Sequence, residues 1–159
     1  MAAIEKALCN RTTAKEVVDA YIARDEDILA IPSATNHVIS GDITFNDEEH
    51  WYRIGLDKVG SSFKFTSQGE GQSKEYLNTV ILFVNGVGPV VSNIVSGWIR
   101  GTFNLLVKDK NLNWHLLGAL QDGCDVSVEA ANDRNGYTLT FTFIGTDLPY
   151  NYTGAITAE

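Results

Sequence analysis

The chain has few cysteines, few basic residues and no long apolar run, and each shortage excludes a class of protein. Its two cysteines, Cys9 and Cys124, are far apart and form no Cys-x-x-Cys pair, so neither a zinc site nor a redox motif is indicated. The 12 basic residues are outnumbered by 20 acidic residues, and the net charge of −8 argues against a protein that wraps nucleic acid, which needs a basic surface. No apolar stretch approaches the ~20 residues of a membrane-spanning helix.

Signals of catalysis are also scarce. The three histidines, His37, His50 and His115, occur in no metal-binding spacing such as HExxH, and we expect structural or surface roles for them. The sequence contains no GxSxG nucleophile motif, and the Gly69–Gly71 stretch lacks the lysine and the following helix of a phosphate-binding loop. We therefore predict a protein that is not an enzyme and that has no catalytic residue, no cofactor and no metal site.

The remaining composition is that of one globular domain. The 159 residues are 44% hydrophobic and 20% charged, which suits a single domain with a real core. Glu5 and Lys6 stand where a secretory signal would be apolar, so we expect no export. We expect one or two helical turns at residues 25–31 and an irregular aromatic tail at 148–152. Alternating apolar and polar residues predict about nine strands, at residues 17–23, 38–45, 51–57, 62–67, 76–85, 102–108, 114–120, 126–130 and 137–143.

One segment, residues 88–101, has the periodicity of a helix. Pro89 suits its first turn, and Gly101 suits the position after its end. Its apolar side chains recur at helical spacing and are expected to pack on the sheets: Val90, Val91, Ile94, Val95, Trp98 and Ile99. Many strands with a single packed helix predict a mainly β fold, a β-sandwich or barrel of about nine strands with one flanking α-helix.

The strand after Gly136 has an unusual polar face. Its apolar face is formed by alternate residues from Tyr137 to Phe143, and the other face carries Thr138, Thr140 and Thr142. A strand face that is free in solvent usually carries lysine and glutamate. A row of small β-forming residues suggests instead a face that meets another sheet, a partner subunit or a crowded interior.

The aromatic residues leave two interpretations open. They could line a groove for a carbohydrate or a peptide, as aromatics do in many β-sandwiches. Alternatively, Trp51 and Trp114 belong to the core, and Tyr150 and Tyr152, beside Pro149, are anchors of a subunit interface. The residues concerned are Trp51, Tyr52, Trp114, Tyr150 and Tyr152.

The order of several segments resembles a known family. The strand segment "RTTAKEVVDAYIAR" is followed by "DILAIP", by the strand pair "SFKFTSQGEGQSKEYLNTVILFVNG" and by a single helix. The hairpin "GTFNLLVKDKNLNWHLLG" and the strand "NDRNGYTLTFTFIG" come next. This order is similar to that of the tail-tube and tail-ring structural proteins of tailed bacteriophages, particularly phages of gut Bacteroides-type hosts. The resemblance covers the chain from about Arg11 to Gly145.

The resemblance implies a virion structural protein. Such a protein has a tail-tube-like fold and forms homo-oligomeric rings, expected to be hexameric, whose inner strands line the DNA channel. Its partners would be neighbouring tail or connector proteins and DNA that passes without specific binding, with no membrane involved. It would be made in the host cytoplasm and located in the virion tail. The chain could form a tail tube, a tail-completion ring or a connector ring, and the alternative outside this family is a monomeric β-sandwich that binds carbohydrate or peptide.

The resemblance also implies roles for particular segments of a single domain spanning residues 1–159. A hairpin loop would reach the neighbouring ring, and the matching residues are Gly69, Glu70, Gly71, Gln72, Ser73 and Lys74. Residues 1–16 and 146–159 would be arms. Thr138, Thr140, Thr142, Tyr150 and Tyr152 would lie at the subunit interface, where the sheets of neighbouring subunits join and no edge strand is left free. An acidic channel would repel phosphate, so that DNA can slide.

Overall fold

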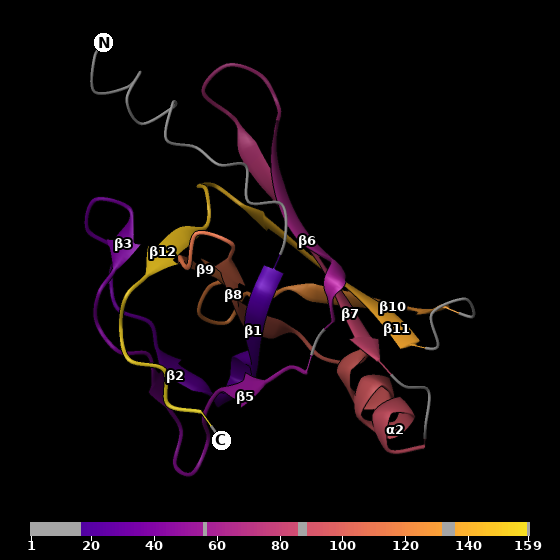
Figure 1. Ribbon diagram of the computed structural model, residues 1–159. Helices are drawn as coiled ribbons and strands as arrows, with labels where there is room; N and C mark the ends of the chain where they lie inside the picture. Colours follow the sequence, from indigo (N-terminus) through magenta and orange to yellow (C-terminus); the bar gives the residue numbers. More distant parts are fainter. Residues whose placement is uncertain (1–16, 56, 86–88, 132–135, 159) are drawn as a thin grey trace.

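The computed structural model describes residues 17–55, 57–85, 89–131 and 136–158, and these residues form a mainly β fold with one helix (Figure 1). The prediction of fold class is therefore confirmed. A turn of 3-10 helix, η1 (Asp25–Asp27), and an α-helix, α2 (Pro89–Trp98), interrupt the strands. The strands are β1 (Val17–Arg24), β2 (Ile28–Ala30), β3 (Val38–Ile39), β4 (Thr44–Phe45), β5 (Tyr52–Arg53), β6 (Asp57–Gln68), β7 (Glu75–Asn85), β8 (Phe103–Asp109), β9 (Trp114–Leu117), β10 (Asp125–Ala131), β11 (Gly136–Gly145) and β12 (Tyr150–Tyr152).

The strands form two main sheets. One sheet has six strands in the order β3-β12-β9-β8-β1-β5, and the other has four in the order β10-β11-β7-β6. A separate pair, β2 and β4, completes the described strands. The longest hairpin, β6 with β7, extends beyond the rest of the four-stranded sheet, so that its tip lies at one end of the molecule and α2 lies at the other (Figure 1).

The main core lies between the two sheets. Alternate residues of β11 and β7 point into it, among them Leu139 and Phe141 on β11, because successive side chains of a strand face opposite sides. From the six-stranded sheet, β8 contributes Leu105 and Val107 to the same core. All four side chains are fully buried, so the sheets are held together by a continuous apolar layer.

A second core covers the outer side of the six-stranded sheet. The segment from β2 to β5 contributes Ile39 and Trp51, and β12 contributes Tyr152. All three side chains belong to the same cluster as Leu106 of β8. Trp51 and Tyr152 are only 1% and 2% exposed. Strand β8 is therefore buried on both faces, which is why six of its seven residues are buried.

Helix α2 packs against the main core through only part of the face that its periodicity indicates. Val95 is 3% exposed and Trp98 contacts the ring of Phe103, with 6.3 Å between ring centroids. Ile94 and Ile99, which the sequence assigned to the packed face, are 48% and 53% exposed, so this part of the expectation was wrong. The side chains of Val90 and Val91 lie outside the described residues.

Three other expectations need correction. Residues 25–31, expected to form one or two helical turns, form the single 3-10 turn η1 and then the strand β2. The tail is not irregular, because β12 pairs with both β9 and β3. Residues 146–158 are consequently part of the sandwich and not a free arm: their last residues pair with Trp51 through a bridge to Ala158. The other expected arm, residues 1–16, lies outside the described residues.

Candidate functional site

The outer face of the four-stranded sheet belongs to neither hydrophobic core, and we call it the open face. Thr138, Thr140 and Thr142 of β11 all point to this side, and each is half-buried. Register places Ile81 of β7 beside Thr140 and Ser62 of β6 beside Ile81. On the other side of β11, Ser127 of β10 lies beside Thr140, so the open face continues across all four strands.

The open face combines small polar residues with a few apolar residues. Ile144, at the end of β11, is 54% exposed, and its neighbour Leu77 on β7 is half-buried. The charged residues that register places on this face among the described side chains are Lys64, Glu75, Asp125 and Glu129. Three of the four are acidic. A surface of this kind is neither a solvated charged face nor a closed core.

The edges of the four-stranded sheet are β6 and β10, and no other described strand pairs with them on their outer sides. Free edges expose unpaired backbone N–H and C=O groups, which makes them sites of pairing with another chain. Strand β6 is twelve residues long. An edge of this length in a stable protein calls for a partner or for a device that blocks pairing.

The tip of the β6–β7 hairpin, residues 69–74, is a well-defined polar turn. The backbone N–H of Ser73 donates to the carbonyl oxygen of Glu70 at 3.2 Å. Gly69 has a φ of 91°, and a Cβ there would lie 2.6 Å from the carbonyl oxygen of Ser73, so the turn requires glycine at this position. Glu70 and Lys74 are exposed, and neither side chain has a hydrogen-bond or ion-pair partner among the described residues.

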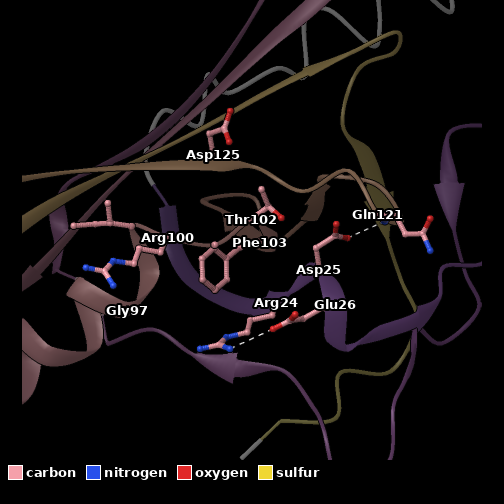
Figure 2. Close-up of a pocket in the computed structure, with 11 residues that line it drawn as sticks. Arg24, Asp25, Glu26, Gly97, Arg100, Thr102, Phe103, Gln121 and Asp125 are labelled. Atoms are coloured by element: carbon pink, nitrogen blue, oxygen red, sulfur yellow. Dashed lines mark hydrogen bonds and ion pairs between the residues drawn. The ribbon is translucent and has the colours of Figure 1, made fainter.

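A polar pocket of about 830 Å³ lies beside the C-terminal end of α2 (Figure 2). Three stretches that are distant in the sequence surround it: residues 24–26 around η1, residues 97–103 after α2, and Gln121 with Asp125 before and at the start of β10. Its floor includes the buried ring of Phe103. The volume falls within the ~300–1,000 Å³ range of ordinary binding pockets.

Asp25 organises one wall of the pocket. Its Oδ1 accepts a hydrogen bond from Nδ2 of Asn104 at 3.1 Å. It also accepts one from the backbone N–H of Gln121 at 2.9 Å (Figure 2). Arg24 and Glu26 form an ion pair of 3.3 Å. Asp25, Arg24 and Glu26 therefore all interact with other groups of the same chain.

Two charged side chains at the pocket have no hydrogen-bond or ion-pair partner among the described residues. Arg100, after α2, and Asp125, at the start of β10, are exposed, and neither side chain makes a hydrogen bond or an ion pair with a described residue (Figure 2). The pocket therefore presents one free positive group and one free negative group on different elements.

A second pocket of about 480 Å³ adjoins the first, and the two share Arg24 and Phe103. Ile94 and Trp98 of α2 form its apolar wall. Asp27 and Glu49, which we call the acidic rim, line it together with the arginines Arg24 and Arg53. Burial, the carboxylate of Glu49 and that of Glu26 raise the pKa of Asp27. The acidic rim is therefore a place where a negative charge costs free energy.

The two tyrosines expected at an interface differ in burial, since Tyr152 is buried and Tyr150 is half-buried. Tyr152 lies inside the second core, where its hydroxyl donates to the carbonyl oxygen of Ala155 at 2.8 Å, so it is a core residue and not an exposed anchor. Tyr150 is half-buried and stacks on His37, with 4.8 Å between ring centroids. His37 Nε2 also lies 3.1 Å from the carbonyl oxygen of Pro149, so this cluster fixes the crossover from β11 to β12.

The five aromatic residues do not assemble into an open groove. Trp51 and Tyr152 are buried, Trp114 packs on Tyr21, and Tyr52 is 45% exposed beside the ring of His50. The remaining histidine, His115, is 2.9 Å from the Asp109 carboxylate. Within the described residues, no three His, Cys, Asp or Glu side chains are placed to hold a metal ion, and no helix is long and apolar enough to cross a membrane.

Sequence reasoning found the threonine row and the hairpin tip but missed the pocket. The pocket is built from short stretches at three places in the chain, and none of them carries a recognisable motif. The sequence offers only a weak indication of the pocket, namely charged residues beside glycines after the predicted helix. Searches of family models, curated proteins and solved structures found no match to this chain.

Proposed function

We propose that the chain is a ring-forming structural subunit of a bacteriophage tail tube, or of a ring that connects the tail to the head. The open face, flanked by two edge strands that have no outer partner among the described strands, is the observation that supports this proposal most strongly. In a ring, β6 of one copy would lie beside β10 of the next, so that the sheets join and each edge gains hydrogen-bond partners. The open faces would then line a common channel.

The chemistry of the open face suits a channel for DNA. Threonine and serine make the wall polar, and Glu75 and Glu129 outnumber Lys64 among its described charges even without Asp125, which also borders a pocket. Positive groups bind phosphate by releasing counterions, so a wall with few of them lets DNA pass without being held. The net charge of −8 acts in the same direction.

The hairpin supports stacking of rings in this proposal. The tip at residues 69–74 is polar and projects from the sandwich, so it contributes nothing to either core (Figure 1). If the tip extends beyond its own subunit, it can contact the neighbouring ring. The alternative function, a monomeric module that binds carbohydrate or peptide, has less support because its aromatic groove is not assembled.

Negative-stain electron microscopy of the purified chain tests the proposal. We expect closed rings with a central channel, or short tubes. Ser127→Lys places a lysine on the exposed edge strand β10, a device that blocks edge pairing, and should abolish rings without unfolding the protein. Ser33→Lys, on an exposed loop, is the matched control and should form rings normally. Single particles of monomer size at every concentration would contradict the proposal.

A further inference from the structure

We propose that the polar pocket beside α2 receives the β6–β7 tip of another copy of this chain. The inference rests on the proposed function, because it names the surface by which one ring would hold the next. It goes beyond that function in assigning a receiving site and two charge pairs, Glu70 with Arg100 and Lys74 with Asp125.

The positions of the two surfaces require a second copy. The tip lies at one end of the molecule, and α2, which borders the pocket, lies at the other (Figure 1). A chain therefore cannot fill its own pocket. A contact between two different surfaces of identical copies is heterologous, and such a contact repeats along an axis instead of closing on itself as a two-fold dimer does.

The chemistry of the two surfaces is complementary. The tip has no apolar side chain, and the pocket that matches it is the polar one and not the adjoining pocket with its apolar wall of Ile94 and Trp98. Each surface carries one free positive and one free negative side chain: Glu70 and Lys74 on the tip, Arg100 and Asp125 in the pocket. Opposite charges fix the orientation of a docked segment even where each exposed pair contributes little affinity.

The size and shape of the two surfaces also agree. A pocket of about 830 Å³ accepts a tight turn of a few residues, and the turn at Gly69 is already formed before docking. A preformed turn loses less conformational entropy on binding than a flexible loop does. The wall formed by Asp25 is fixed by its hydrogen bonds to Asn104 and Gln121, so the receiving surface is preorganised as well.

Cysteine cross-linking of two full-length proteins tests the inference directly. One protein carries Gln72→Cys at the tip and the other Thr102→Cys at the pocket, both with Cys9→Ser, since the remaining Cys124 is completely buried. We expect a disulfide-linked dimer of the two proteins under mild oxidation. Thr35→Cys, an exposed position away from the pocket, replaces Thr102→Cys as the matched control and should cross-link at least about tenfold less.

A charge-reversal cycle tests the assigned pairs. Glu70→Lys and Arg100→Glu should each lower the yield of stacked rings by about tenfold, and the double variant should restore stacking. If rings form but the tip cross-links equally at Thr102 and Thr35, or if the double variant does not recover, the inference is wrong while the proposed function stands. If no rings form at all, the proposed function itself fails, so the two failures are distinguishable.

Discussion

The two sheets of the sandwich differ in how many faces they bury. The six-stranded sheet is covered on both sides, and β8 shows this by alternating between the two cores, with Leu105 in one and Leu106 in the other. The four-stranded sheet has one fully buried face, and its outer face is only partly covered. Strand β11 alternates between the fully buried Leu139 and the half-buried Thr140, whereas Phe83 of β7, beside Thr138 on the outer face, is 2% exposed. The six-stranded sheet ends in two short edge strands, β3 and β5, of two residues each. The four-stranded sheet ends in two longer ones, β6 and β10, which pair with no other described strand on their outer sides. In the proposed ring, assembly would occur through these longer edges and the open face.

The largest expected difference between the sheets concerns charge on their outer faces. Leu106→Asp should unfold the domain, because an unpaired buried carboxylate costs several kcal/mol against a total stability of ~5–15 kcal/mol. Thr140→Asp should leave a folded protein that is less stable by about 1 kcal/mol, as its face is not enclosed. Urea unfolding followed by circular dichroism measures both. Equal damage from the two changes would show that the open face is closed within the monomer.

Helix α2 allows the same comparison on a smaller scale. Val95→Asp should cost several kcal/mol, because the side chain is 3% exposed in the main core. Ile94→Asp, one residue earlier and 48% exposed, should cost less than about 0.5 kcal/mol. Thermal melting distinguishes them. Unfolding by Ile94→Asp would mean that the packed face of the helix is the broader one that its periodicity indicates.

The sequence predicts the long helices and strands of this fold better than the short ones. The alternation of β11 and the periodicity of α2 are long, and both elements were found. Strand β12 has three residues and owes its existence to its pairing with β9 and β3, so no local pattern in the sequence marks it. For the same reason Tyr152, which looks like a residue of a loose tail, is part of a core that forms only when distant segments meet.

The candidate functional features also differ in whether they are local in the sequence. The tip at residues 69–74 and the threonines of β11 are local features and were visible in the sequence. The pocket depends on Asp25, Arg100 and Asp125 converging from three segments, which follows from the strand order and not from any spacing. Exposure of Ile94 and Ile99 was also invisible, because periodicity shows which residues share a side of a helix but not how wide the packed strip is.

A smaller effect is expected at the acidic rim beside α2. The pKa of Asp27 is raised in the folded state, so the folded state binds its proton more tightly, and stability falls as the pH rises through that pKa. Asp27→Asn should therefore raise the melting temperature at pH 7, and its advantage should vanish as the pH falls to the ordinary aspartate value of about 3.9. Asp47→Asn, on an exposed turn nearby, is the control. A gain that does not depend on pH would contradict the electrostatic cause.

The smallest effect on stability is expected at the hairpin tip. Replacement of residues 69–74 by Asn-Gly should leave circular dichroism and melting almost unchanged, because loop length costs little and the tip contacts neither core. Its effect on assembly should be large, since shortened copies form rings that fail to stack. Electron microscopy compares particle lengths for the two proteins. Normal stacking would show that the tip is a solvated turn, and loss of folding would show that the β6–β7 register depends on it.

The molar mass in solution shows whether other copies of the chain complete the four-stranded sheet. Multi-angle light scattering of the full-length chain, over a range of protein and salt concentrations, reports the number of subunits without any label. We expect species of six or more subunits, whose share grows with protein concentration and which Ser127→Lys removes. A mass of 17.4 kDa for the unaltered chain under every condition would contradict the account.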